Sequence, residues 1–152
     1  MKILITGAAG HIGSGLSRLL IENGHDLTLV DNLRNGYLEN LKDEANEVIA
    51  PFYEVDITSQ DFFTECGGDY DVIIHLAAIT SLPDCESNPL ETLRINVSGT
   101  ANVLEFARKF DVPHVVFAST SAIYENNDTD VFTEDLEVNP RLYYSLSKKM
   151  SE

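Results

Sequence analysis

The sequence predicts an α/β fold, in which helices cover both faces of a doubly wound parallel sheet. Strand-like and helix-like segments alternate along all 152 residues. The strand-like segments are continuous apolar runs, which is typical of parallel strands buried on both faces. A glycine-rich turn joins the first strand to the first helix. Right-handed crossovers then favour the spatial strand order 3-2-1-4-5.

The first half of the chain supplies three strands and the helix between the first two. The runs KILIT, DLTLVD and VIAPFYEVD predict strands at 2–6, at 26–31 and within 48–56. Apolar residues recur at helical spacing over 11–25, and a glycine stops that helix. The polar stretch 32–47 is expected to form a loop with a short helical piece.

The second half supplies two strands, three helices and a polar loop over 125–140. The runs YDVIIHLAA and PHVVFASTS predict strands within 70–78 and 113–121. A Ser/Thr cap, a proline in a first turn and helical spacing predict helices at 58–66, 89–110 and 141–152. The expected buried side of the longest helix consists of Leu93, Val97, Val103, Leu104 and Ala107.

Composition excludes several classes of function. The net charge is −15, from 25 acidic and 10 basic residues, whereas nucleic acids and anionic membranes are bound by clustered Lys and Arg. No apolar run approaches the ~20 residues that cross a bilayer, so we expect a cytoplasmic protein. Cys66 and Cys85 lack a His or Cys at metal-ligand spacing, so the sequence predicts reduced thiols and no metal.

Gly7, Gly10 and Gly13 have the spacing and context of a dinucleotide-binding turn, because they follow a strand and open a helix. The first would allow the tight turn, the second the approach of a pyrophosphate, and the third close packing of the helix. Asp31 ends the second strand, where a carboxylate accepts hydrogen bonds from an adenosine ribose, so NAD is preferred over NADP. Arg34 leaves that preference open to test, since a nearby Arg can receive a 2′-phosphate.

Seven short motifs follow one another along the chain in a characteristic order and at characteristic distances. They are the glycine turn, VDNLRNG at 30–36, VDI at 55–57, HLAA at 75–78, NVSGTANVLEFA at 96–107, FASTSAIY at 117–124 and YSLSK at 144–148. With them the whole chain resembles the extended short-chain dehydrogenases/reductases, in particular the NAD-dependent epimerase/dehydratase family that acts on nucleotide sugars. The resemblance implies a Rossmann-type NAD(P)-binding domain over residues 1–152.

The resemblance also implies roles for individual residues. Thr120, Tyr144 and Lys148 match the catalytic hydroxyl residue and the Tyr-x-x-x-Lys pair, whereas Tyr143 is left as a packing or pocket residue. Asp56 and Ile57 would contact adenine. The full set of cofactor-binding residues would be Gly7, Gly10, His11, Ile12, Gly13, Asp31, Asn32, Asp56, Ile57, Leu76, Ala77, Ala78, Asn96, Tyr144 and Lys148.

The chemistry explains the spacing of the pair, because residues four apart share one face of a helix. A phenol is a poor base at neutral pH, and a neighbouring ammonium favours its ionised form. Tyr144 would then remove a sugar hydroxyl proton while hydride passes to NAD. Sugar dehydratases of the family carry acids directly after the Thr, where this chain has Ser121 and Ala122, so an epimerase or a simple oxidoreductase is favoured over a dehydratase. The segment DNLRNG at 31–36 is also more similar to the sugar 4-epimerases of the family. Glu125 departs from the family's usual glycine.

Relatives implied by the resemblance continue beyond these motifs with a sixth strand and a smaller domain that binds the nucleotide sugar. Residues 1–152 are therefore expected to be the cofactor half of an enzyme, with little turnover alone. The alternatives are a stand-alone dinucleotide-binding module and an inactive remnant. The sugar and the oligomeric state stay open, a homodimer being one arrangement that the resemblance allows.

Overall fold

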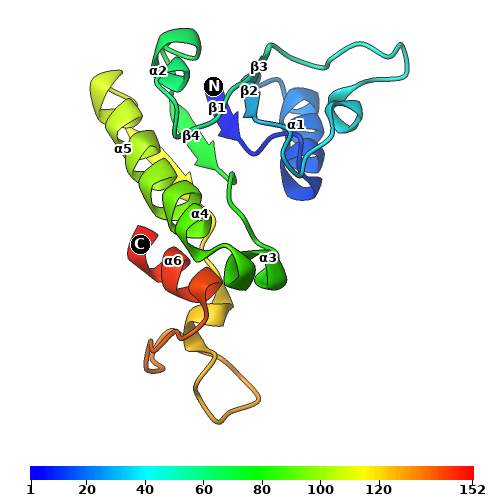
Figure 1. Ribbon diagram of the computed structural model, residues 1–152. Coiled ribbons are helices and arrows are strands. Elements are labelled where there is room, and N and C mark those ends of the chain that lie inside the picture. The colour runs from blue at the N-terminus through cyan, green and yellow to red at the C-terminus, as the bar shows by residue number, and fades with distance from the viewer. The chain divides into compact units, whose positions relative to one another are not determined.

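The computed structural model describes residues 1–152, which divide into two compact units (Figure 1). The first unit consists of Met1–Ala77 with Asn102–Phe117, and the second of Ala78–Ala101 with Ala118–Glu152. None of the helices combines the length and apolar character that crossing a membrane would require.

The first unit is built on a five-stranded parallel sheet with the order β3-β2-β1-β4-β5, which confirms the predicted topology. The central strand pairs on both sides, so that Ile5 lies opposite Leu29 and also opposite Ile74. Parallel strands end at a common edge, and the loops that follow β1, β2 and β4 therefore gather there. The strands are β1 (Lys2–Thr6), β2 (Asp26–Asp31), β3 (Phe52–Glu54), β4 (Val72–His75) and β5 (His114–Phe117).

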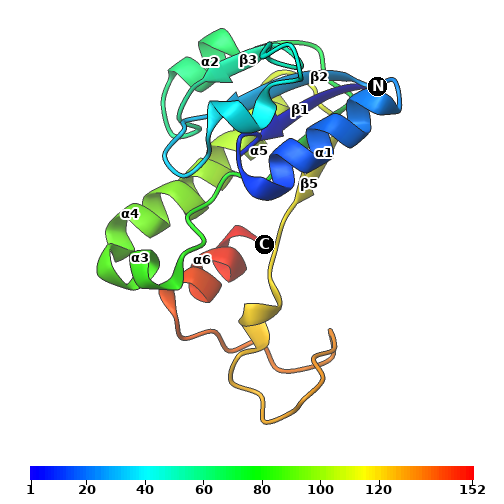
Figure 2. The ribbon, with the colours of Figure 1, turned by 90° about the vertical axis from the view of Figure 1, so that its right-hand side faces the viewer.

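Helices cover both faces of this sheet (Figure 2). One apolar cluster includes side chains of β1 and β2 together with residues of α1 (His11–Glu22) and of the short η1 (Leu38–Leu41). The other cluster joins the sheet to α2 (Asp61–Glu65) and to the part of α5 (Gly99–Lys109) that belongs to this unit. Phe62 and Phe106 meet in the second cluster with ring centroids 4.7 Å apart.

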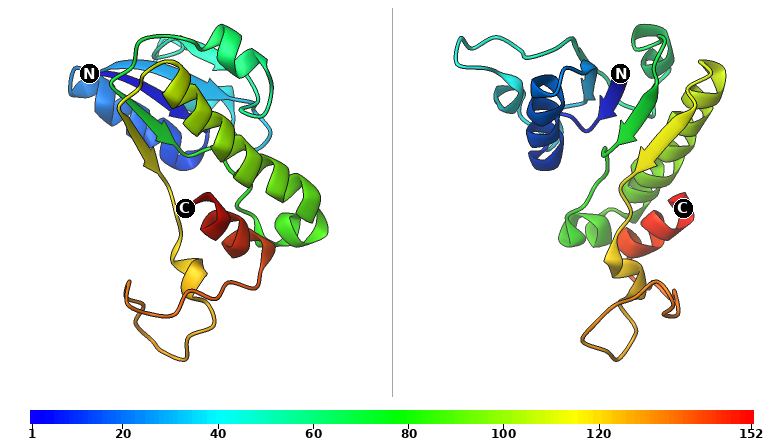
Figure 3. Two further views of the ribbon diagram at one scale, coloured as in Figure 1. Left: turned by 90° about the vertical axis from the view of Figure 1, so that its left-hand side faces the viewer. Right: turned by 180° about the vertical axis from the view of Figure 1, so that it is seen from behind.

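The second unit is helical and carries the C-terminal helix (Figure 3). Its elements are α3 (Leu82–Ser87), α4 (Pro89–Leu93), the π-helical η2 (Arg94–Ser98), η3 (Ser121–Tyr124) and α6 (Tyr143–Ser151). Helix α6 packs on α3, α4 and η2. Tyr144 packs against a small buried cluster of Ile79, Cys85 and Ile95.

The structure corrects two expectations about helices. Residues 89–109 are helical as predicted, but a π-helical segment interrupts them, and Leu104 is 49% exposed rather than buried. The buried side includes Asn96 and Thr100, polar residues that a search for apolar periodicity passes over. Helix α3 was not predicted, because its six residues are too few to show a helical period.

Candidate functional site

The turn after β1 needs glycine at two positions for the fold itself. Gly7 has φ +73°, and a Cβ atom there would lie 2.6 Å from the backbone nitrogen of Ala77. A Cβ atom on Gly13 would lie 2.3 Å from the carbonyl oxygen of Gly7. The first glycine lets β1 turn beside the residues that follow β4, and the second lets α1 pack directly on the turn.

Gly10 differs, because its added Cβ atom would meet only the carbonyl oxygen of Gly7, at 3.3 Å. It is the N-cap of α1, where no side chain caps the helix and the first turn contains no acidic residue. His11 and Ile12 follow it with exposed side chains. The first N–H groups of a helix have no partner within the helix and carry partial positive charge. This turn therefore fits a dinucleotide diphosphate.

Asp31 ends β2 beside the glycine turn. Its carboxylate accepts hydrogen bonds from the backbone nitrogens of Ala9 at 3.0 Å and Leu33 at 2.8 Å. Burial raises the pKa of Asp31, while these N–H groups act in the opposite direction. A carboxylate offers about four acceptor sites, and the backbone nitrogens of Ala9, Leu33 and Asn32 leave at least one of them open. The side chain is thus fixed in one orientation and can still accept a hydrogen bond from a ribose hydroxyl.

Asn32 and Asp56 lie together at the ends of β2 and β3. Asn32 Nδ2 donates to Asp56 Oδ2 at 3.3 Å, and the backbone nitrogen of Thr58 donates to Asp56 Oδ1 at 2.8 Å. Ile57 is only 4% exposed and its side chain belongs to the apolar core. Adenine could therefore reach Asp56 through its side chain but Ile57 only through its backbone.

Leu76 and Ala77 extend the chain beyond β4 in the same unit. The backbone nitrogen of Leu76 donates to the carbonyl oxygen of Thr6 at 3.0 Å. The side chains of both residues are half-buried against the apolar clusters. They border the glycine turn through the close approach of Ala77 to Gly7. Ala78, also predicted at this position, belongs to the second unit.

The second unit contains the three residues predicted to be catalytic. Tyr144 and Lys148 are one turn apart on α6. Lys148 is 4% exposed, and its Nζ donates to the carbonyl oxygen of Ala118 at 2.8 Å. Desolvation by burial lowers the pKa of Lys148 to about 8. The ammonium is thereby tied to the chain two residues before Thr120, the N-cap of η3.

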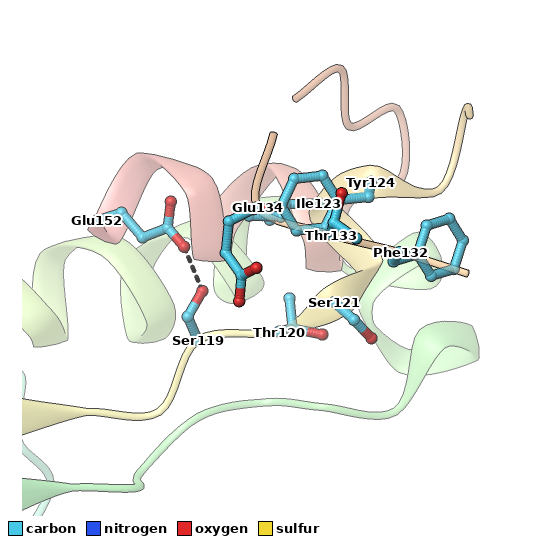
Figure 4. A pocket seen from close by; sticks show the side chains of 9 residues that line it. All are labelled: Ser119, Thr120, Ser121, Ile123, Tyr124, Phe132, Thr133, Glu134 and Glu152. Atoms are coloured by element: carbon cyan, nitrogen blue, oxygen red, sulfur yellow. Dashed lines mark hydrogen bonds between the residues drawn. The ribbon is translucent and has the colours of Figure 1, made fainter. Parts of the chain in front are cut away.

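A cavity of about 300 Å³ adjoins Thr120 within this unit (Figure 4). Thr120 Oγ1 accepts a hydrogen bond from the backbone nitrogen of Ala122 at 3.2 Å, which leaves its proton available. Ser119 Oγ donates to a carboxylate oxygen of Glu152. The lining residues are Ser119, Thr120, Ser121, Ile123, Tyr124, Phe132, Thr133, Glu134 and Glu152. The space is open on one side, and its lining combines hydroxyl and carboxylate groups with the apolar side chains of Ile123 and Phe132.

Asn96, a predicted cofactor contact, is 2% exposed and lies in the π-helical η2. Its Oδ1 accepts from the backbone nitrogen of Ile79 at 2.8 Å. Its Nδ2 donates to the carbonyl oxygen of Ile79 and to Ser147 Oγ, both at 2.9 Å. Both amide hydrogens are therefore engaged inside the protein, and one of them connects η2 to α6.

Two carboxylates at the start of α6 were missed as site residues. Glu125 Oε1 accepts from the backbone nitrogen of Leu142 at 3.0 Å, and Glu86 Oε1 from that of Tyr143 at 2.9 Å. One feature of the sequence could have pointed to them. The N-cap position of this helix has no Ser, Thr, Asp or Asn, so its first N–H groups need partners from elsewhere in the chain.

Comparison with known proteins places this chain in a family. Residues 3–152 match the model of the "NAD dependent epimerase/dehydratase family". A UDP-N-acetyl-alpha-D-glucosaminuronate decarboxylase of Bacillus cytotoxicus is 35% identical over 97% of this chain and 44% of its own length. A UDP-glucose 4-epimerase of Bacillus subtilis is 30% identical over all of this chain and 46% of its own length.

A solved structure gives the same result. The UDP-glucose 4-epimerase of Thermus thermophilus, in complex with NAD, superposes with a TM-score of 0.86 at 31% identity over 99% of this chain and 48% of its own. The chain thus spans about half the length of the proteins it matches. The predicted resemblance is confirmed, and the chain belongs to the NAD dependent epimerase/dehydratase family.

Proposed function

We propose that the protein carrying this chain is an NAD-dependent nucleotide-sugar epimerase of the UDP-glucose 4-epimerase type. The family and the names of the relatives support the substrate class. The observation that carries the proposal is the hydrogen bond from Lys148 Nζ to Ala118, because it ties a buried ammonium to the segment that bears Thr120. A phenol one helical turn away is then the natural base.

The residues of the first unit fit a dinucleotide. The uncapped start of α1 at Gly10 would hold its diphosphate, and the Asp31 carboxylate would accept from the adenosine ribose. Asn32, Asp56, Leu76 and Ala77 would complete the contacts. When bound, the oxidised nicotinamide would supply a hydride acceptor that also returns the hydride.

The chain's own residues would handle the proton. Tyr144 would take it from a sugar hydroxyl, and the Lys148 ammonium would favour the ionised phenol. Even with its pKa lowered to about 8, Lys148 is still mostly protonated at neutral pH. Thr120 Oγ would donate its free proton to the reacting oxygen. Delivery of the hydride to the opposite face of the carbonyl carbon of the keto sugar, with return of the proton from Tyr144 to its oxygen, would complete epimerisation.

The Asp31 carboxylate also supports NAD over NADP, since a 2′-phosphate beside it would meet like charge. Calorimetric titration of the protein with both dinucleotides tests this. We expect NAD to bind more tightly than NADP, and Asp31→Ser to narrow the difference. If NADP instead binds more tightly than NAD, and Arg34→Ala weakens NADP binding, then Arg34 receives the 2′-phosphate.

Turnover is tested with UDP-glucose and UDP-galactose in the full-length protein. We expect interconversion without net consumption of NAD, and little turnover by residues 1–152 alone, because the relatives are about twice as long. NAD binding without any reaction of a nucleotide sugar in the full-length protein would favour a dinucleotide-binding module. Failure to bind either dinucleotide would refute the proposal.

A further inference from the structure

Helix α6 begins at a residue that cannot cap it. Its N-cap is Leu142, whose extended backbone has φ −79° and ψ 147° and whose side chain has no hydrogen-bonding group. The first N–H groups of any helix need partners from outside the helix. A Ser, Thr, Asp or Asn at the N-cap normally supplies one. Because α6 bears Tyr144 and Lys148, whatever replaces that cap also decides how firmly these side chains are held.

Glu125, which lies 17 residues before Leu142, provides hydrogen-bond partners at this end of the helix. Its Oε1 accepts hydrogen bonds from the backbone nitrogens of Arg141 at 2.6 Å and Leu142 at 3.0 Å, and from Ser145 Oγ at 2.9 Å. Glu86 of α3 accepts from the next backbone nitrogen, that of Tyr143. Two carboxylates thus accept from three successive backbone N–H groups, those of Arg141 just before the helix, Leu142 at its N-cap and Tyr143, its first residue, and they place negative charge at the positive end of the helix dipole.

The pKa of Glu125 agrees with this geometry. Partial burial favours the neutral acid, but the hydrogen bonds from Arg141 and Leu142 prevail and lower the pKa below its usual value. The group is therefore a carboxylate at neutral pH, the form that accepts charge-assisted hydrogen bonds from a helix N-terminus.

The place of Glu125 in the chain gives this cap a wider effect. It directly follows η3, and Thr120 is the N-cap at the other end of the same short element. Its carboxylate therefore connects the element that presents the Thr120 hydroxyl to the helix that presents the phenol and the ammonium. We propose that Glu125 is a positioning residue, which holds the start of α6 against η3 and so fixes Tyr144 and Lys148 relative to Thr120. The catalytic importance of those three side chains rests on the proposed function.

Hydrogen exchange of the full-length protein tests the cap without any assumption about activity. In Glu125→Ala, we expect exchange at the amides of Arg141 and Leu142 to become about tenfold faster, as for loss of an N-cap. Glu125→Gln keeps an oxygen that accepts the same N–H groups and should retain most of the protection. The control is Asp130→Asn, which removes the same charge from an exposed residue of the same loop and should change nothing.

Kinetics then tests the positioning. With a nucleotide sugar that the wild-type protein converts, Glu125→Ala should lower kcat by about tenfold to a hundredfold and leave KM nearly unchanged, because misplaced groups lose rate rather than binding. Glu125→Gln should recover most of kcat. If Glu125 only stabilised the fold, Glu125→Ala would lower the melting temperature and leave the kcat of the folded protein unchanged.

Each result decides the proposal. Unchanged exchange at Arg141 and Leu142 in Glu125→Ala would overturn it, as would faster exchange spread equally over β1, which would indicate general unfolding. An equal effect of Asp130→Asn would overturn it too. If the wild-type protein converts no nucleotide sugar, the proposed function fails, while local loss of protection in Glu125→Ala would still establish the cap.

Discussion

Lys148 Nζ donates a 2.8 Å hydrogen bond to the carbonyl oxygen of Ala118, and burial lowers the pKa of this lysine from 10.5 to about 8. Between pH 8 and pH 10.5 the unfolded chain therefore keeps the lysine proton while the folded chain has released it. The free energy of unfolding should rise with pH across this interval. We expect the contribution of Lys148 to change by on the order of 3 kcal/mol over the whole interval.

A comparison with Lys148→Met isolates this effect from other titrations, because methionine keeps a flexible apolar stem without the charge. Urea unfolding at a series of pH values should show the variant more stable than the wild type at pH 7, with the difference shrinking toward pH 10. A difference that stays constant across the interval would mean that the lysine keeps its ordinary pKa in the folded protein.

Substitutions of the glycines near the start of α1 should separate effects on stability from effects on ligand binding. Gly13→Ala should lower the melting temperature, because its Cβ atom would lie 2.3 Å from the carbonyl oxygen of Gly7. Gly10→Ala should fold normally, since its contact at 3.3 Å needs only a small adjustment, but should weaken NAD binding. Binding is measured by calorimetry and stability by thermal unfolding.

Gly15→Ala is the matched control, because Gly15 is an exposed residue of α1 and an added Cβ atom has nothing within 4 Å. It should stabilise the protein by about 0.5–1 kcal/mol through helix propensity and leave NAD affinity unchanged. Equal NAD affinity of Gly10→Ala and Gly15→Ala would argue against a diphosphate at the glycine turn.

Features that depend on neighbouring residues could be predicted from the sequence. The strand order follows from continuous apolar runs and the handedness of crossovers, and the turn at Gly7 and Gly13 from a short motif in its strand–helix context. The i,i+4 spacing of Tyr144 and Lys148 is likewise local.

Features that depend on distant residues could not be predicted. The N-terminus of α6 is capped by Glu125 and Glu86, the latter 57 residues away from Tyr143, and no periodicity connects such positions. The buried amide of Asn96, in the π-helical turn, bonds Ile79 and Ser147, which lie 17 and 51 residues away in the sequence, so these contacts exist only in the packed structure. The cap of α6 and the contacts of Asn96 are therefore tertiary hydrogen bonds, which local sequence patterns do not reveal.

The two neighbouring tyrosines offer the sharpest test of the catalytic assignment. Tyr144 packs its ring against Ile79, Cys85 and Ile95, whereas Tyr143 is 38% exposed and meets Glu86 through its backbone nitrogen, which substitution leaves in place. Tyr144→Phe should therefore fold normally, bind NAD and lose about 10²–10⁴-fold in kcat, the usual contribution of a general base. In the full-length protein, Tyr143→Phe should retain kcat within about twofold of the wild type, since the proposed mechanism gives its hydroxyl no part in proton transfer. Steady-state rates, melting temperatures and NAD affinities of both variants decide the matter, and equal losses of kcat would remove Tyr144 from its role as the base.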